Sequence, residues 1–483
     1  MKSHWRFFVA PALGVIAVGG FHPFELWFMP LLSLVLVLML AQSRRFTDRL
    51  LIFYLYGLGF LGPLLHWSST YVGSFPWILL TISFATFFMV LALGYREQQL
   101  QLFLVAAAFV IGEGLRALLP FGGFGWGRFG FSQLDGPLQV WLRLGGVALT
   151  GFVLAYTAAL IARVNRYSFF ALPILLSSSL LIPPATAAPE PEFQSTPVRI
   201  GLVQGGVSQL GLNFNATPQE VFDRHIAVTE ELLEQESVDL ILWPENASDI
   251  DPTSNMILKA RINELASIHS TPLVIGAVTQ SDLGPENVSL LFDGGAEVVS
   301  RYQKRDLVPF GEYIPLRSIA ERFSSLTDSV RDFVAGSEIV AHSVGGITFA
   351  PLICYEILDD RVTYENLEFS NVGVVQTNNA TFGRSWQSGQ QFQMTRVRAY
   401  ESRVPFVVAA TTGDTALIGP DGNILSRLTK FDPGFLVVEV PPSKPQIPAL
   451  PPELTLSLSG IFLAVTRFVS LKRWKAKILG WMR

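Results

Sequence analysis

The stretch Pro351-Leu352-Ile353-Cys354-Tyr355-Glu356 carries the only cysteine of this 483-residue chain. Apolar and β-branched residues run from Gly345 to Ile353, and acidic residues follow the cysteine. This pattern predicts a buried strand that brings a thiol to its end, where a turn begins. One cysteine cannot form an internal disulfide, so Cys354 either packs as a small apolar side chain or reacts.

The composition divides the chain into two kinds of sequence. Half of the residues are hydrophobic (50%) and only 15% are charged, where a soluble globular chain has roughly 25% charged residues. The net charge of −4 gives no basic surface for nucleic acid. We therefore expect a transmembrane bundle at 1–183, a linker at 184–197, a folded extramembrane domain at 198–442, and a return linker, last span and basic tail at 443–483.

A membrane-spanning helix needs about 20 mostly apolar residues, and about eight segments approach that length. They are residues 5–21, 26–41, 50–66, 76–93, 100–118, 138–161, 168–183 and 454–471. Lysine and arginine gather at the N-terminus, in alternate loops and in the C-terminal tail. By the positive-inside rule, both termini are cytoplasmic and residues from about 184 to 453 lie on the outer side.

The predicted third outer loop alternates glycine with aromatic residues from Pro120 to Phe131. Aromatic side chains favour the headgroup level of a membrane, so the loop is either an interfacial belt or a surface that accompanies a lipid substrate. In the second case Trp126 and Arg128 are candidate substrate-binding residues, with Arg128 as a phosphate partner.

Short apolar strands and helical patterns alternate in the extramembrane domain. This alternation predicts an α/β layered domain with buried sheets. The predicted strands are 198–204, 238–243, 272–278, 288–292, 296–301, 347–353, 372–377, 406–410 and 416–418. The predicted helices are about 218–236, 255–268 and 386–402.

Three reactive side chains follow predicted strands: Glu245, Lys304 and Cys354. A thiol needs a base to become a strong nucleophile, and no histidine of the domain has a comparable strand-end position. The buried carboxylate of Glu245 is placed to act as that base. Lys304 and the backbone N–H of Tyr355 would stabilise an oxyanion, so the set predicts acyl transfer through a thioester. Taken singly, Glu245 also fits a solvated turn, and Lys304 beside Arg305 fits a solvated charge pair.

Other cofactor chemistry has no signature in the sequence. Histidine and cysteine do not cluster with ligand spacing, and no glycine loop fits a phosphate. We expect no metal and no cofactor.

The reactive residues resemble the nitrilase, or carbon–nitrogen hydrolase, superfamily. Its three motifs match, in order, Trp243-Pro244-Glu245, the segment 304–315 reading KRDLVPFGEYIP, and Cys354-Tyr355-Glu356. The resemblance covers residues 198–442 and implies a four-layer α-β-β-α sandwich with a Glu–Lys–Cys triad. It also implies that Glu312 is a second essential glutamate and that Tyr355 and Glu356 support the site.

The membrane part narrows the resemblance. With residues 125–138, ending FSQLDGPL, the whole chain resembles the membrane-embedded branch of the superfamily, the apolipoprotein N-acyltransferases. That resemblance implies a multi-pass enzyme of the bacterial cytoplasmic (inner) membrane with its catalytic domain outside. It would move a fatty acyl chain from a membrane phospholipid, through a Cys354 thioester, to the α-amine of the S-diacylglyceryl-cysteine of an apolipoprotein. The kinetics would be ping-pong, and we expect a monomer.

Two positions depart from the family pattern. Thr381, in the run Asn378–Gly383, stands where tryptophan is common, and the family often has another tryptophan near Phe214. Together with Phe382, these residues complete the candidates for substrate binding.

Two other functions remain open from the sequence. One is a membrane-tethered amidase that hydrolyses a small substrate, although a multi-span bundle is a large tether for such an enzyme. The other is a membrane scaffold or transporter with a degenerate catalytic domain. Against the latter, all three triad residues are present, and the spans lack the inward charges that a transporter usually has.

Overall fold

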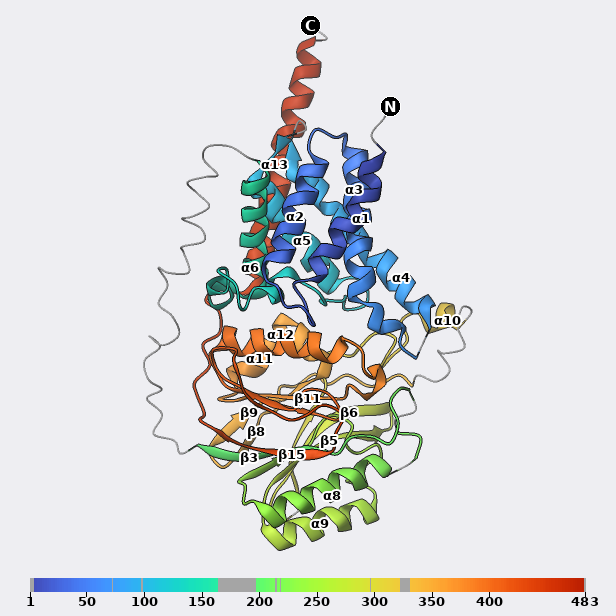
Figure 1. Ribbon diagram of the computed structural model, residues 1–483, viewed down its shortest axis with the longest axis vertical. Coiled ribbons are helices and arrows are strands. Elements are labelled where there is room, and N and C mark those ends of the chain that lie inside the picture. The colour runs from blue at the N-terminus through green and yellow to red at the C-terminus, as the bar shows by residue number, and fades with distance from the viewer. Residues whose placement is uncertain are drawn as a thin grey trace. The chain divides into compact units, whose positions relative to one another are not determined.

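The computed structural model describes residues 4–71, 73–96, 99–163, 197–212, 215–217, 219–295, 297–321 and 331–481. The described chain forms two compact units (Figure 1). The first holds the residues up to His66, those from Ser74 to 163, and those from Pro448 onward. The second holds Trp67–Gly73 and the chain from 197 to Ile447, and we call it the catalytic unit.

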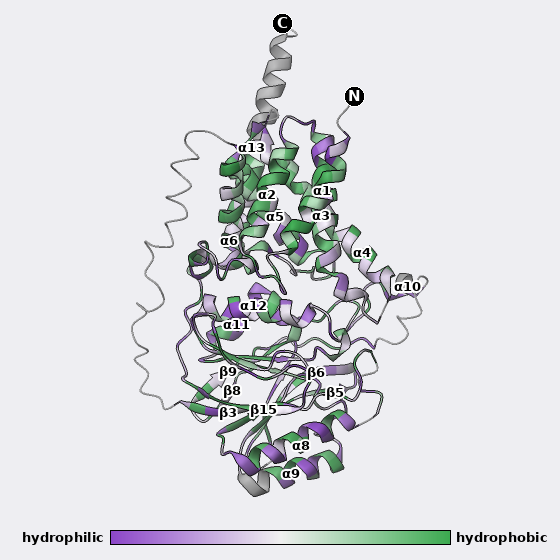
Figure 2. Cartoon of the chain, viewed as in Figure 1, coloured by the Kyte–Doolittle hydropathy of each residue, from purple (hydrophilic) through white to green (hydrophobic). Residues whose placement is uncertain are grey.

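The first unit is built from helices, and Figure 2 colours most of their residues as hydrophobic. A Cβ atom on Gly59 would collide with the carbonyl oxygen of Pro11, so glycine lets two of these helices, α1 and α3, touch backbone to backbone. The helices are α1 (Trp5–Val18), α2 (Phe28–Ala41), α3 (Phe46–Leu64), α4 (Ser74–Ala85) continued by η2 (Thr86–Gly94), α5 (Leu102–Leu118), α6 (Val140–Ala162) and α13 (Pro452–Trp481).

The described helices support the predicted spans only in part. Two of them, Ser74–Gly94 and Val140–Ala162, are long and apolar enough to cross a membrane. Three shorter apolar helices are Trp5–Val18, Phe28–Ala41 and Pro452–Thr466. The predicted span 168–183 lies outside the described residues. Eight spans are therefore not confirmed.

The catalytic unit contains two large sheets. The six-stranded sheet has the order β15-β3-β4-β5-β6-β7, and the five-stranded sheet has the order β10-β11-β12-β13-β14. The strands of the first are β3 (Val198–Gln204), β4 (Leu240–Leu242), β5 (Leu273–Ser281), β6 (Gly284–Phe292), β7 (Val298–Gln303) and β15 (Gly434–Val440). Those of the second are β10 (Leu352–Ile353), β11 (Gly373–Thr377), β12 (Phe406–Ala410), β13 (Ala416–Ile418) and β14 (Ile424–Arg427).

The two sheets and their helices form four layers (Figure 1). Ile200 and Leu202 of β3 pack with Val374 and Val407 in a core shared by both sheets. On the other face of the six-stranded sheet, α8 (Glu220–Gln235) and α9 (Met256–His269) form a second core. Helices α11 (Asp360–Glu368) and α12 (Gln387–Ser402) contact the five-stranded sheet. The predicted α-β-β-α sandwich is confirmed.

The strand predicted at 347–353 is wrong as one continuous element. It divides into β9 (Ile347–Phe349), which pairs with β8 (His342–Val344), and β10, which pairs with β11. Pro351 lies at the division and has no N–H to donate to a neighbouring strand. The sequence patterns also missed α11, β8, β14 and β15, and β15 forms the edge of the six-stranded sheet beside β3.

Candidate active site

Strand ends bring the reactive residues together. Within the six-stranded sheet β3, β4 and β5 are parallel, and within the other sheet β10, β11 and β12 are parallel. Glu245 comes shortly after β4, Cys354 directly after β10 and Asn378 directly after β11. The carboxyl ends of parallel strands share one edge of a sheet, so all three residues meet where the two sheets face each other.

Lys304 joins two carboxylates at this place. Its Nζ donates to Oε1 of Glu312 at 2.9 Å and lies 3.4 Å from Oε1 of Glu245. The Lys304 and Glu245 side chains are 1% and 5% exposed, and that of Glu312 is 13% exposed. An ammonium held this far from water keeps its position only because both carboxylates neutralise it.

Asn287, in the middle of β6, completes the cluster and was missed from the sequence. Its Nδ2 donates to Oε1 of Glu245 at 2.8 Å and to Oε1 of Glu312 at 2.9 Å. The second oxygen of each carboxylate accepts a backbone N–H at 2.8 Å, from Asn378 for Glu245 and from Val308 for Glu312. Every oxygen of the two acids therefore has a donor, and the Glu245 carboxylate is held in one orientation.

Cys354 stands at a strained turn beside this cluster. Its backbone φ is +51°, a left-handed conformation that is unusual for any residue but glycine. The residue is partly exposed. Burial of the sulfur and the charge of Glu245 together raise the pKa of the Cys354 thiol to about 12, although Lys304 and a hydrogen bond with Thr377 oppose the rise. The thiol is therefore protonated at rest and would need a base to act as a nucleophile.

The charge of Lys304 is fixed by its surroundings. Burial alone would lower the pKa of Lys304, but Glu312, Glu245 and Cys354 raise it well above its ordinary value. Lys304 is therefore a permanent cation at this site and is suited to hold a negative oxygen rather than to exchange protons.

Glu356 braces the turn that carries the thiol. Its Oε2 accepts the N–H of Ile353 at 2.8 Å, and its Oε1 accepts the N–H of Arg305 at 2.7 Å and the hydroxyl of Tyr302 at 2.9 Å. Burial raises the pKa of Glu356. One fully buried carboxyl thus connects the residue before Cys354 with the residue after Lys304. Its neighbour Tyr355 is also buried.

The segment after β11 forms another side of the site region. Thr381 and Phe382 lie half-buried in the short helix η7 (Ala380–Phe382). The ring of Phe382 meets Trp67 edge to face at 5.1 Å between centroids. The Trp67 indole also donates to Oε1 of Gln390 at 3.1 Å. Phe214 lies outside the described residues.

Trp126 and Arg128 lie in the first unit and are 2% and 4% exposed. Arg116 donates to the carbonyl oxygen of Trp126 at 2.5 Å, and Glu113 accepts the N–H of Phe129 at 2.7 Å. The buried side chains of Arg116 and Glu113 thus hold the backbone of the glycine-aromatic loop in place. The substrate contacts of Trp126 and Arg128 stay a prediction.

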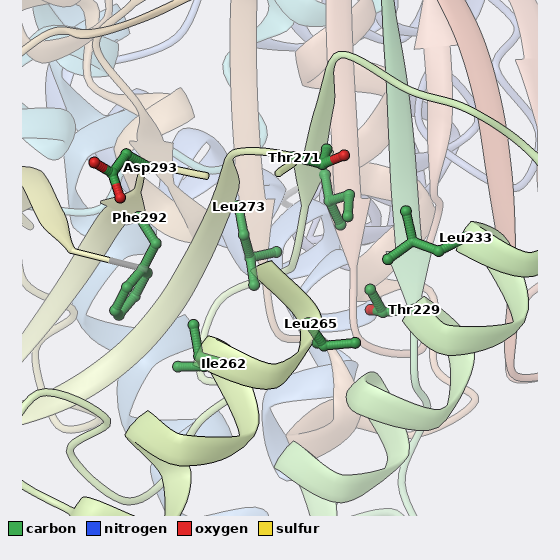
Figure 3. A pocket seen from close by; sticks show the side chains of 9 residues that line it. Thr229, Leu233, Ile262, Leu265, Thr271, Leu273, Phe292 and Asp293 are labelled. Atoms are coloured by element: carbon green, nitrogen blue, oxygen red, sulfur yellow. The ribbon is translucent and has the colours of Figure 1, made fainter. Parts of the chain in front are cut away.

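A small cavity elsewhere in the catalytic unit belongs to the core. It lies between α8, α9 and the six-stranded sheet, and leucine, isoleucine and phenylalanine side chains make most of its wall (Figure 3). None of its lining residues belongs to the cluster around Lys304. Among the described residues, no group of histidine, cysteine, aspartate and glutamate could hold a metal ion.

Comparisons with known proteins divide the chain as the fold does. Residues 13–160 match the family model of the apolipoprotein N-acyltransferase N-terminal domain, and residues 199–446 match that of carbon–nitrogen hydrolase. An apolipoprotein N-acyltransferase of Mycolicibacterium smegmatis is 33% identical over 447 residues, which are 79% of this chain and 70% of that protein. One from Pseudomonas paraeruginosa is 29% identical over 92% of this chain and 91% of its own length. Among solved structures, an amidase from Nesterenkonia sp. is 21% identical, covers 52% of this chain and 93% of its own, and has a TM-score of 0.39.

Proposed function

The chain belongs to the apolipoprotein N-acyltransferase family and is an acyltransferase with a carbon–nitrogen hydrolase domain, and on that premise we propose that it transfers a fatty acyl chain from a membrane phospholipid to lipoprotein N-termini. The acceptor is the α-amine of an S-diacylglyceryl-cysteine. The observation that carries the proposal is the cluster in which Lys304 pairs with Glu245 and Glu312. The charges of these three residues act on the thiol of Cys354, the sole cysteine.

In the first half-reaction, Glu245 takes the proton of the Cys354 thiol while sulfur attacks the ester carbonyl carbon. The carbonyl oxygen becomes an oxyanion, which the Lys304 ammonium and the N–H of Tyr355 stabilise. The carbon–oxygen bond to glycerol then breaks. Glu245 returns its proton to the leaving oxygen, so a lysophospholipid departs and an acyl thioester remains on Cys354.

In the second half-reaction, the α-amine of the acceptor attacks the thioester carbonyl carbon. Glu245 takes a proton from the nitrogen as the new carbon–nitrogen bond forms, and the oxyanion again lies beside Lys304. The carbon–sulfur bond breaks, and the sulfur recovers the proton from Glu245. The product is an N-acylated lipoprotein, and the two steps together are ping-pong.

The role of Glu312 follows from its contacts. It shares Lys304 and Asn287 with Glu245, so it offsets the lysine charge without accepting the thiol proton. Substrate contacts are proposed for Thr381 and Phe382 in the catalytic unit and for Trp126 and Arg128 in the first unit. Phe214 is proposed with them on sequence alone.

We propose the membrane arrangement on the sequence pattern and the apolar helices. The bundle has about eight spans, both termini are cytoplasmic, and the catalytic unit lies outside the bacterial inner membrane. The domain bounds are those of the composition change, 1–183, 184–197, 198–442 and 443–483. The enzyme acts as a monomer.

Intact mass after incubation with phospholipid tests the proposal. The wild type should gain one fatty-acyl mass that hydroxylamine removes, and a diacylglyceryl peptide should discharge it. Cys354→Ala and Glu245→Gln should gain nothing. A wild type that releases free fatty acid or hydrolyses small amides, without acylating the peptide, would instead indicate a hydrolase.

A further inference from the structure

A side-chain amide faces the sulfur of Cys354 from helix α12. Nε2 of Gln391 donates to Sγ at 3.7 Å. Gln391 lies one turn into α12 and is 3% exposed. It does not belong to the Glu245–Lys304 cluster, and nothing in the sequence motifs singled it out.

The orientation of this amide is determined by its own oxygen. Oε1 of Gln391 accepts Nδ2 of Asn379 at 2.8 Å and Nε2 of Gln387 at 3.2 Å. A carbonyl oxygen has two lone pairs, so these two donors occupy it fully. The amide cannot turn over without placing its N–H groups against those donors. Its nitrogen therefore faces the sulfur.

A donor at sulfur has little effect on a neutral thiol, which is a weak acceptor. It has a larger effect on an anion, because hydrogen bonds to ionised groups are roughly twice as strong. Sulfur carries negative charge when the thiol loses its proton and again when the thioester breaks. An interaction that strengthens only as charge develops lowers the barrier rather than the ground state.

We propose that Gln391 is a further catalytic residue, which donates a hydrogen bond to Sγ of Cys354 and stabilises the sulfur anion as it forms and as it leaves the acyl group. The proposal rests on the proposed role of Cys354 as nucleophile. Lys304 then holds the oxygen side of the tetrahedral intermediate and Gln391 holds the sulfur side. The second half-reaction depends on Gln391 more strongly, because there the sulfur is the leaving group.

The single cysteine makes this proposal measurable without any lipid. The rate of alkylation by iodoacetamide reports the thiolate of Cys354 and no other thiol. In Gln391→Leu, which has no donor, we expect alkylation about tenfold slower throughout a pH series, equivalent to about 1.4 kcal/mol. Gln391→Glu keeps the shape and still accepts from Asn379, but it turns an acceptor toward sulfur, so we expect a larger loss. Gln391→His keeps an N–H donor and should recover part of the rate.

Gln393→Leu provides the control, because Gln393 is a buried glutamine of the same helix, 5% exposed, on another face. It should alkylate like the wild type. Thermal unfolding establishes that each variant folds, and Gln391→Glu carries the test if Gln391→Leu does not fold. A folded Gln391 variant without a donor that keeps the wild-type rate and pH profile overturns the proposal.

Acylation by phospholipid and discharge by an amine distinguish this proposal from the proposed function. Slower alkylation in the Gln391 variants, with no lipid acylation of the wild type, supports the sulfur contact and rejects the phospholipid donor. Normal acylation and discharge in Gln391→Leu supports the function and rejects the catalytic role of Gln391. If only discharge slows, the effect on the leaving sulfur is the dominant one.

Discussion

Replacing Asn287 by leucine should damage both stability and catalysis, because one amide serves two carboxylates, the buried Glu245 and the partly buried Glu312. The change removes hydrogen bonds of 2.8 Å and 2.9 Å to Glu245 and Glu312. Hydrogen bonds to charged groups contribute about 1.5–3 kcal/mol each, and the apolar leucine recovers part of the loss through burial. We expect the free energy of unfolding of the catalytic unit to fall by about 3 kcal/mol.

The expected catalytic loss follows from the position of Glu245, the proposed base. Without Asn287, the Glu245 and Glu312 carboxylates repel each other around a single lysine. A shift of about 1 Å at a reacting group costs on the order of 100-fold in rate. We therefore expect thioester formation to slow by about 100-fold, measured by intact mass against time.

Ser289→Ala is the control on the same strand. Ser289 is equally buried and contacts Nε2 of His342 at 3.1 Å, away from the carboxylates. Its loss should cost about 1 kcal/mol of stability and leave acylation unchanged. The reasoning would be refuted by an Asn287→Leu enzyme that acylates at the Ser289→Ala rate.

Three further outcomes are expected. Lys304→Met leaves the buried Glu245 and the partly buried Glu312 without a cation, so stability measured in denaturant should fall by about 3–5 kcal/mol and acylation should be lost; near-normal acylation would remove Lys304 from the mechanism. Burial lowers the pKa of His225 and of His342 from 6.5 to about 4. Both take up protons on unfolding, so each should cost the catalytic unit about 3 kcal/mol as the pH falls from 6.5 to 4, and His342→Gln should flatten the measured dependence. Trp67→Ala removes the edge contact with Phe382, so lipid acylation should slow by about tenfold while iodoacetamide alkylation is unchanged; equal slowing of both would mean general disruption.

The order and type of elements near the triad were predictable from sequence. Runs of apolar residues predicted β3, β5, β11 and β12 within a few residues, and polar residues at strand ends identified Glu245, Lys304 and Cys354. These predictions succeed because buried strands have an unmistakable composition, and the strand ends of an α/β sheet are where side chains converge.

Residues that act from inside an element were not predictable. Asn287 lies in the middle of β6, and Gln391 is one of four glutamines between positions 387 and 393 of α12. Neither has a motif, and only the pairing of β6 with its neighbours and the packing of α12 determine which polar side chain reaches the site. Strand β15 was missed although residues 435–438 form an apolar run, and its place at the edge of the six-stranded sheet follows only from its pairing with β3.

The seven residues Trp67–Gly73 lie between segments of the first unit in the sequence, but in the fold they belong to the catalytic unit. Their flanking helices belong to the first unit, yet Trp67 packs on Phe382 and donates to Gln390 within the catalytic unit. Tyr71 also packs against the catalytic unit, because a Cβ atom placed on Gly383 would lie 2.7 Å from the hydroxyl oxygen of Tyr71. In a protein expressed from residues 198–442 alone, Phe382, Gly383 and Gln390 would therefore lose these contacts and face solvent. A minimal enzyme therefore needs residues 67–73 as well, either as a grafted loop or as an added peptide. Adding the peptide to the domain 198–442 should restore the contacts that these domain bounds leave out.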